Sequence, residues 1–358
     1  MKVSFYRVGS SWVALKAMFD KLKIPVVLPP KITQKTIAFG AKHSPESCCE
    51  PFKYVVGEYR DAIEAGADTF FYIGSGVREG CRIPQFASGT EDILEKQGYK
   101  IKMIGWGGQN LKKTFREIKK AAPNLTFFKF TLLELWIILK LTYVEWLDDF
   151  INQLRPYTKN YEACNKLHEK GLELIDKAQN ILQLISAKSK IKKLSKKIER
   201  TKEKPIPIIV VGDLYLILEP AINNHIFEKL GKLGIIPYRS FYLSHFLRRS
   251  GKIIGPWGKN SFKSKLKFAK KYIDKTMTYG TLESVGDTVR MLKEGKIKGI
   301  IHMHSFTCMP EVINQIIYKK IAKDFNVPLL ELSIGEHQTE AHQDTRLEAF
   351  VDLLRKKN

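Results

Sequence analysis

Several common sequence signatures are absent from these 358 residues, and each absence narrows what the chain can be. The five cysteines include no Cys-x-x-Cys pair, which is the usual mark of a structural zinc site. Their odd number, in a chain expected in a reducing compartment, argues against a disulfide framework. No phosphate-binding loop of the Gly-x-x-x-x-Gly-Lys-Ser/Thr type occurs either. Ligand binding or redox chemistry therefore stays open for the cysteines.

Long uninterrupted apolar runs are missing as well. The first residues contain no continuous apolar block ahead of a small-residue cleavage site, so we expect no secretory signal and a cytoplasmic location. The most apolar window, residues 127–147, is broken by Lys129, Glu134, Lys140 and Glu145. A membrane span needs about 20 nearly uninterrupted apolar residues. We interpret the window as a buried or partner-facing helix and expect no membrane contact.

Acidic residues are scarce relative to basic ones: 37 Asp and Glu stand against 60 Lys and Arg, which gives a net charge of +23. Such an excess attracts nucleic acid, anionic lipid or an acidic partner, but lysines spread along a chain usually form a solvated surface. The densest segment, Lys188 to Lys204, carries nine basic and two acidic residues without interleaved aromatic residues. A long solvated helix bridging two domains is favoured there over a nucleic-acid patch.

The pattern of the chain predicts an α/β fold with parallel sheets. Strand and helix patterns alternate up to about residue 125, strand patterns vanish in residues 126–204, and alternation resumes in residues 205–358. The first third is expected to include a strand at residues 24–30, "IPVVLPP". Because single cores seldom grow to this length, we predict two doubly wound parallel-sheet domains joined by a helical segment.

Two cysteines share an unusual setting, because each stands two residues before a proline where an amphipathic pattern begins. These are Cys49, ahead of Pro51, and Cys308, ahead of Pro310. Proline suits the first turn of a helix, so both thiols are predicted at helix N-termini, where the helix dipole favours thiolate. Cys81 and Cys308 also follow predicted strands. Since ligands gather at the carboxyl ends of parallel strands, all three cysteines are expected at ligand-bearing edges.

If the two domains face each other across a cleft, these three distant cysteines converge. Three thiolates suit an iron–sulfur cubane with one iron left open, because soft sulfur ligands select such clusters or zinc. The alternative is simple packing, since cysteine is among the most buried residue types. Spacing alone leaves both interpretations open.

The chain resembles the 2-hydroxyacyl-CoA dehydratase family, which includes benzoyl-CoA reductase subunits, and is most similar to its stand-alone, activase-related branch. The resemblance covers nearly the whole chain in the family's order. It is carried by residues 15–53, 59–86, 212–235, 304–313 and 339–354, which include "SPESCCEPFK", "GSGVREGCRIPQF" and "HSFTCMPEVI".

The resemblance implies a four-iron four-sulfur cluster between two Rossmann-like domains, with Cys49, Cys81 and Cys308 as ligands. Cys48 is left open as a fourth ligand, although neighbouring side chains diverge. It also implies electron delivery by a separate ATP-hydrolysing activase of the actin and sugar-kinase fold, and an acyl-CoA or other small-molecule substrate. A homodimer, or a second dehydratase-like subunit, stays open, and no residue is assigned a catalytic role.

The chain departs from the family pattern in two places. Arg78, in "REGCR", stands where relatives can have an extra cysteine, so a double cubane is not expected. The sequence "IPQF" replaces the usual aromatic pair after Cys81, which leaves the substrate preference undefined. Cys164, in the helical segment, is interpreted as structural.

Charged residues near the cysteines are further candidates. Lys53 and Arg82 are predicted beside the thiolate ligands, where positive charge would lower a thiol pKa and stabilise an anionic cluster. His302 and His304 alternate along the predicted strand before Cys308. For them, packed imidazoles at a strand end are favoured, and a proton donor or a hydrogen bond toward the cluster, with His304 as the candidate, is the alternative.

Two loops complete the set. Glu336, His337, Glu340 and His342 lie in a loop that is predicted to line the crevice, with Asp344 or Thr345 capping the last helix. The Gly-rich loop "GSGVREG" lacks the full dinucleotide-binding spacing and is interpreted as backbone room for a cluster.

Three functions follow as hypotheses. The first is an iron–sulfur reductase or dehydratase component that accepts low-potential electrons. The second is a non-catalytic scaffold or regulatory partner that keeps the cluster but has no substrate cavity. The third, a basic nucleic-acid-binding protein, is the least favoured.

Overall fold

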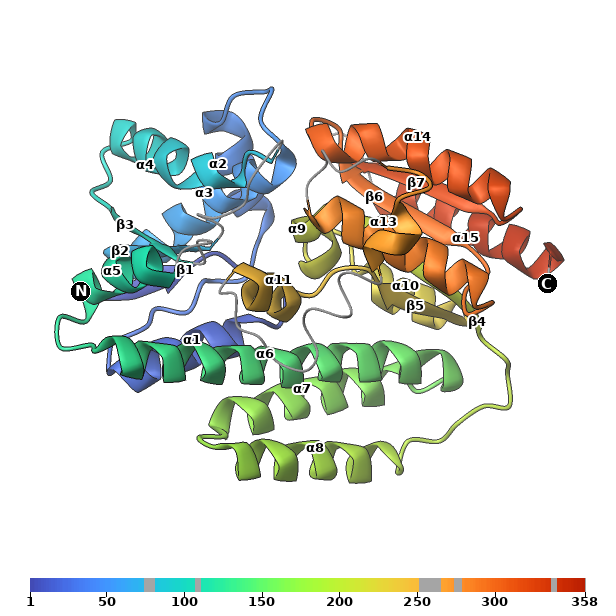
Figure 1. The fold of residues 1–358 in the computed structure, drawn as a ribbon, viewed down its shortest axis with the longest axis horizontal. Coiled ribbons are helices and arrows are strands. Elements are labelled where there is room, and N and C mark those ends of the chain that lie inside the picture. Colours follow the sequence, from blue (N-terminus) through green and yellow to red (C-terminus); the bar gives the residue numbers. More distant parts are fainter. Residues whose placement is uncertain (74–80, 107–110, 251–264, 274–278, 336–339, 358) are drawn as a thin grey trace.

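Two parallel sheets and a layer of long helices make up the computed structural model (Figure 1). It describes residues 1–73, 81–106, 111–250, 265–273, 279–335 and 340–357. The predicted α/β class with parallel sheets is confirmed. The domain boundaries at residues 125 and 204 stay predictions.

The N-terminal sheet has the strand order β1-β2-β3 and is parallel throughout. Its strands are β1 (Val3–Phe5), β2 (Thr69–Ile73) and β3 (Lys102–Trp106). β2, "TFFYI", is a nearly continuous apolar run, as expected for a strand covered on both faces. The accompanying helices are α1 (Trp12–Leu22), α2 (Gln34–His43), α3 (Glu50–Glu64), the short η1 (Ile83–Gln85), α4 (Phe86–Lys96) and α5 (Leu111–Ala121).

The segment between α1 and α3 differs from the prediction. Residues 24–30 do not form a strand: Val26 makes only an isolated bridge with Val3, because the two prolines that follow end the pairing. Helix α2 was not predicted, although Thr33 and Thr36 form a capping box at its start.

Helices α2 and α3 pack backbone to backbone through glycines. A Cβ atom on Gly40 would lie 1.8 Å from the carbonyl oxygen of Lys53, and one on Gly57 would lie 2.1 Å from that of Thr36. Only glycine allows so close an approach. The contact fixes the path of the loop between the two helices, which contains Cys48 and Cys49.

The second sheet has the order β5-β4-β6-β7 and is also parallel. Its strands are β4 (Ile206–Gly212), β5 (Ile235–Arg239), β6 (Ile300–Ser305) and β7 (Leu329–Ile334). Its helices are α9 (Leu214–Leu218), α10 (Ile226–Lys232), α11 (Leu243–Ser250), α13 (Tyr279–Lys293), α14 (Met309–Asp324) and α15 (Glu340–Lys357). Asp344 and Thr345 lie inside α15, so the prediction that one of them caps it is wrong. Asp344 instead pairs with Lys229 at 2.7 Å.

The helical layer consists of α6 (Phe127–Leu154), the short η2 (Arg155–Tyr157), α7 (Tyr161–Lys177) and α8 (Ile181–Ser195). Figure 1 shows α6 crossing beneath both sheets, with α7 and α8 below it. The predicted long solvated helix over Lys188 to Lys204 is wrong, because the helix ends at Ser195 and its Leu184, Ala187 and Ile191 face are buried. Asn180 caps α8. The apolar stripe of this helix packs in one cluster with residues of α6 and α7.

Helix α6 buries three of the charges that interrupt its apolar sequence, and each has a specific partner. Glu134 accepts a hydrogen bond from the indole N–H of Trp106, Lys140 donates to the carbonyl of Asp176 at 2.8 Å, and Glu145 accepts from Ser244. None of the described helices has the length and apolarity needed to cross a bilayer. The prediction of a buried helix over residues 127–147 is confirmed for the side of α6 that carries these buried residues.

We expect Glu134 to make stability depend on pH. Burial raises its pKa to about 7 from an ordinary value of 4.5, and the Trp106 hydrogen bond only partly opposes this. The folded protein therefore binds a proton that the unfolded chain releases between these values. The stabilisation is complete below pH 4.5 and is lost as the pH rises through 7, with an amplitude of about 3 kcal/mol.

Urea unfolding of Glu134→Gln across this range measures the effect. The amide keeps an acceptor for Trp106 but cannot ionise, so the variant should gain about 3 kcal/mol relative to the wild type between pH 4.5 and pH 8. A difference between the two proteins that does not change with pH would contradict the assignment.

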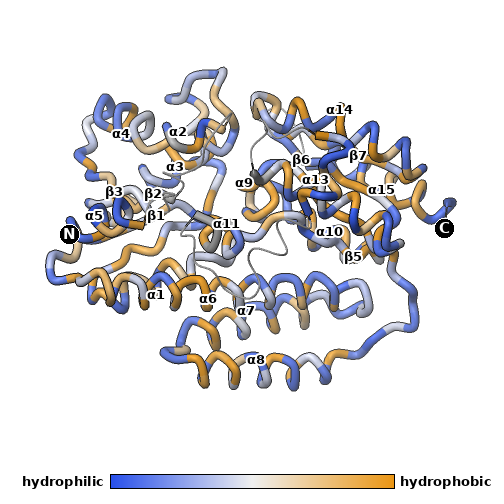
Figure 2. Tube along the Cα trace, in the orientation of Figure 1, coloured by the Kyte–Doolittle hydropathy of each residue, from blue (hydrophilic) through white to orange (hydrophobic). Residues whose placement is uncertain are grey.

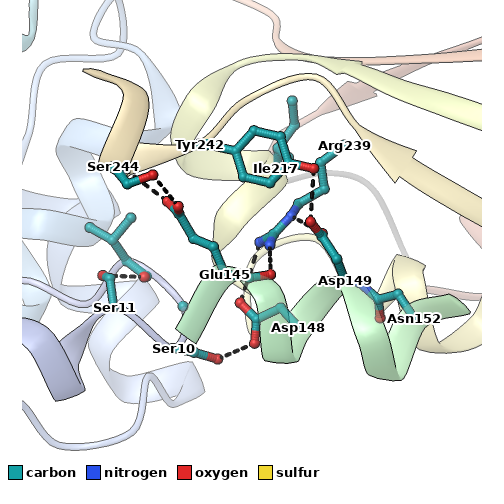
Figure 3. A network of polar contacts seen from close by, with 12 residues as sticks. Ser10, Ser11, Glu145, Asp148, Asp149, Asn152, Ile217, Arg239, Tyr242 and Ser244 are labelled. Carbon is teal, nitrogen blue, oxygen red and sulfur yellow. Dashed lines mark hydrogen bonds and ion pairs between the residues drawn. The ribbon is translucent and has the colours of Figure 1, made fainter. Parts of the chain in front are cut away.

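A second buried network joins α6 to the end of β5 (Figure 3). The guanidinium of Arg239 contacts Asp149 at 2.9 Å, Asp148 at 3.3 Å and the carbonyl of Glu145 at 2.9 Å. Asp148 also accepts from Ser10 at 2.8 Å, which brings the loop after β1 into the same network. Helix α6 is thereby attached both to β5 of the second sheet and to the loop after β1 of the first sheet.

Candidate cysteine site

The loop before α3 and the loop after β6 meet where the two sheets face each other. The backbone N–H of Glu50 donates to the hydroxyl of Ser305 at 3.0 Å, and the hydroxyl of Thr307 donates to the carbonyl of Cys48 at 2.8 Å. These two bonds join segments more than 250 residues apart. They place Cys49 and Cys308 on facing loops.

Both cysteines stand at helix starts, as predicted. Cys49 is the N-cap residue of α3 and Cys308 is the N-cap residue of α14, and each helix has a proline in its first positions. Cys81 lies two residues before η1, and it is the first described residue after the gap at residues 74–80. Each of the three thiols is partly buried.

Asp213 connects the three thiols, and the sequence analysis did not single it out. Its carboxylate caps α9 by accepting from the backbone N–H groups of Tyr215 and Leu216, and the Cys308 thiol hydrogen-bonds to it. Electrostatic interaction with Asp213 raises the pKa of Cys49, Cys81 and Cys308 alike. The signal was available: Asp213 directly follows β4, at the carboxyl end of a strand.

The prediction that the helix N-termini hold these cysteines as thiolates is wrong for the protein alone. Burial raises the pKa of Cys49 to about 12 and that of Cys81 to about 11, and it raises that of Cys308 further. Backbone N–H groups, such as that of Phe52 near Cys49, offset only part of this. The desolvation of a thiolate and the nearby carboxylates outweigh the helix dipole.

The effect predicted for Lys53 and Arg82 is found at Cys48, and for the other three thiols it stays a prediction. Lys53 is buried and pairs with Glu50 at 3.2 Å, while Arg82 is exposed and donates to the carbonyl of Ser47 at 2.6 Å. The charge of both lowers the pKa of Cys48, although burial still raises it overall. The two positive charges therefore act on Cys48, the cysteine whose role as a fourth ligand is undecided.

Two other cysteine predictions concern Cys48 and Cys164. Cys48 is one of the electrostatic neighbours that raise the pKa of Cys49, and its role as a ligand stays a prediction. Cys164 is fully buried in the apolar cluster between α6, α7 and α8. Packing accounts for its position.

The two histidines of β6 are buried and stack on each other with ring centroids 5.0 Å apart. His302 contacts Glu311 at 3.0 Å, and His304 contacts the side chain of Gln315 and the carbonyl of Ser305. Burial, with the neighbouring His302, lowers the pKa of His304, so this imidazole is neutral at physiological pH. These contacts agree with packed imidazoles at a strand end.

Glu311, which the sequence analysis also missed, brings a second carboxylate toward the thiols. It is buried and raises the pKa of Cys81, Cys308 and Asp213. Its position three residues after Cys308 places it in the first turn of α14.

A cavity of about 760 Å³ opens beside the cysteines. Its walls include the side chains of Cys48, Cys49 and Cys81, and Met309 of α14 also lines it. Phe52, Phe86 and Ile93 supply apolar surface, Arg82 and His43 supply basic groups, and Lys96 is paired with Asp92, another residue of the wall, at 2.9 Å. A cavity of this size and composition suits a small molecule with an apolar body and an anionic group.

The donor set is of the kind that holds sulfur-ligated cofactors, because soft thiolate ligands select iron–sulfur clusters or zinc. Among the described residues, no three His, Cys, Asp or Glu side chains are close enough together to hold one metal ion. Metal binding would relieve the crowding of thiols and carboxylates at this site.

Two predictions lie outside the described residues: Glu336 with His337, and the Gly-rich loop at residues 74–80 with Arg78. Glu340 and His342 begin α15, where Glu340 pairs with Lys229 at 2.6 Å.

No family model and no curated protein matches the chain.

Proposed function

We propose that the protein is an iron–sulfur component related to 2-hydroxyacyl-CoA dehydratases. In this proposal Cys49, Cys81 and Cys308 hold a four-iron four-sulfur cluster at the seam of two Rossmann-like domains. The observation that carries it is the meeting of the Cys49 and Cys308 loops through the Glu50–Ser305 and Thr307–Cys48 hydrogen bonds. The cavity that both Cys49 and Cys81 line supports the inclusion of Cys81 in this site.

When bound, such a cluster supplies one electron at low potential to a substrate. The protein's own groups hold and shield it: the N-caps of α3 and α14 aim backbone N–H groups toward the sulfurs, and hydrogen bonds to cluster sulfurs are a main determinant of potential. Cluster binding would require the thiols to lose their protons, and Asp213, which is hydrogen-bonded to the Cys308 thiol, could accept one of them. The electron source in this proposal is a separate ATP-hydrolysing activase.

The cavity favours a reductase or dehydratase component over a scaffold without a substrate site. It exposes Cys48, Cys49 and Cys81 to a space large enough for a small molecule. Arg82 in its wall suits an anionic substrate such as an acyl-CoA. We propose this class of substrate.

Anaerobic cluster reconstitution of the purified protein tests the function. We expect about four irons and four sulfides for each chain, a brown colour and, after reduction, an EPR signal typical of a cubane. A colourless protein without stoichiometric iron and sulfide would refute the proposal. Zinc bound in place of iron would also refute it.

A further inference from the structure

An exposed apolar face lies on the helical layer. Six large side chains form it: Phe128 (72% exposed), Leu132 (51%) and Leu135 (43%) from α6, and Ile181 (52%), Leu182 (73%) and Ile185 (51%) from α8. We call these six residues the α6–α8 face. Figure 2 shows hydrophobic residues along both helices. Exposed apolar residues gathered in this way mark an interaction surface.

A groove of about 510 Å³ joins the two halves of this face. Leu132 and Ile181 both line it, so the residues from α6 and α8 belong to one surface. Trp136 lies in the same groove, together with Lys21 and Lys129. The most exposed members, Phe128 and Leu182, are not among the groove-lining residues. The face therefore combines a shallow apolar groove with projecting apolar side chains.

The charge along α8 has one sign. The sequence contains no acidic residue from position 177 to 198, whereas α8 and its end expose Lys190, Lys192, Lys193 and Lys196. On the helical path of α8, Lys192 and Lys196 continue the outward-facing stripe that Leu182 and Ile185 begin. The partner of this face is accordingly anionic and apolar.

These features decide between the candidate occupants. A second copy of the chain, docked by a two-fold contact, would set the same lysines against each other. Single-stranded nucleic acid is bound by basic residues together with aromatic rings that stack on the bases, whereas the exposed side chains of this face are mainly aliphatic. An anionic bilayer surface accepts both the projecting apolar side chains and the lysines that follow them along α8.

We propose that the α6–α8 face binds the surface of anionic membranes, which replaces the sequence-based expectation of no membrane contact. Phe128, Leu182 and Ile185 enter the boundary between headgroups and acyl chains, and the lysines of α8 contact the lipid phosphates and carboxylates. The helices lie on the bilayer and do not cross it. The cysteine site is on the other side of the sheets from α8 in Figure 1, so it stays open to substrate and partners.

Vesicle co-sedimentation of the full chain tests this proposal. We expect binding to phosphatidylcholine vesicles that contain roughly 30 mol% phosphatidylserine, weaker binding at high salt, and little binding to phosphatidylcholine alone. Leu182→Asp combined with Phe128→Asp should weaken binding at least ten-fold. Lys192→Glu combined with Lys193→Glu should do the same at low salt and remove most of the salt dependence.

Ile316→Asp is the matched control. Ile316 is also 73% exposed, but it lies on α14 beside the cysteine site, so this variant should bind vesicles as the wild type does. Circular dichroism confirms that each variant is folded, as expected for changes at exposed positions.

Three results would overturn the proposal. They are the absence of wild-type binding to the anionic vesicles, an equal loss in Ile316→Asp, and a dimer in solution that Leu182→Asp converts to a monomer. The last would assign the face to a second copy of the chain. Binding to an acidic polypeptide without binding to vesicles would likewise assign the face to a protein partner.

Discussion

Replacing Cys308 by alanine is expected to remove most of the iron from the reconstituted protein, with a loss larger than roughly ten-fold. Cys308 is the only one of the three proposed ligands that belongs to the second sheet, since Cys49 and Cys81 are placed by elements of the first. Its loss leaves two thiols on one side, and two thiols do not retain a cubane. Iron and sulfide analysis after anaerobic reconstitution measures the effect.

Two cysteine variants serve as controls for this experiment. Cys164→Ala changes a buried thiol in the helical layer and should keep the full iron content, with only a modest loss of stability. Cys48→Ala distinguishes three ligands from four, because it lowers the iron content only if Cys48 is a ligand. Equal iron in Cys308→Ala and Cys164→Ala would show that the three-thiol site does not exist.

Arg239→Met is expected to destabilise the protein by about 3–5 kcal/mol. Arg239 is buried, and its guanidinium compensates Asp148 and Asp149, which are held in the same network (Figure 3). Burial favours the neutral form of both carboxyls, and the charge of Arg239 lowers the pKa of each. Methionine fills part of the volume but removes the cation that both carboxylates share, while Asp148 keeps its contact with His168 at 2.7 Å.

Urea unfolding at neutral pH measures this loss, with Arg290→Ala as the control. Arg290 makes similar contacts with Asp287 of α13 and with Glu294 just after this helix, but it is partly exposed, and exposed pairs contribute about 0–1 kcal/mol. Equal losses in the two variants would mean that the Arg239 network is no more important than a surface ion pair. At lower pH, protonation of the two aspartates should reduce the cost of Arg239→Met.

The strands of both sheets could be predicted because their apolar runs have the length and flanks of buried parallel strands. β4, "IPIIVVG", and β6, "IIHMHS", needed no tertiary information. Helix α2 could not be predicted, because its sequence "QKTIAFGAKH" has only a weak apolar stripe, and it is stabilised by close packing of Gly40 on α3. Residues 24–30 have the composition of a strand but pair only through Val26.

The candidate site was only partly readable from sequence. The two Cys-x-Pro junctions predicted the helix starts correctly, because proline and the N-cap are local properties. The electrostatics could not be predicted in the same way. The high pKa of the thiols depends on burial and on Asp213 and Glu311, which approach from separate parts of the second half. The partners of Lys53 and Arg82 likewise depend on how the loops fold over Cys48.

Helix α6 has a mechanical consequence for the space between the sheets. It contacts α1 and, through Glu134, Trp106 at one end, and it contacts β5, α10 and α11 further along. One continuous helix of 28 residues thus packs against both halves and restricts their relative movement. A motion that parts the two halves would have to bend α6 or break the Arg239 network, so we expect small molecules to reach the cysteines through the cavity that Cys48, Cys49 and Cys81 line rather than by separation of the halves.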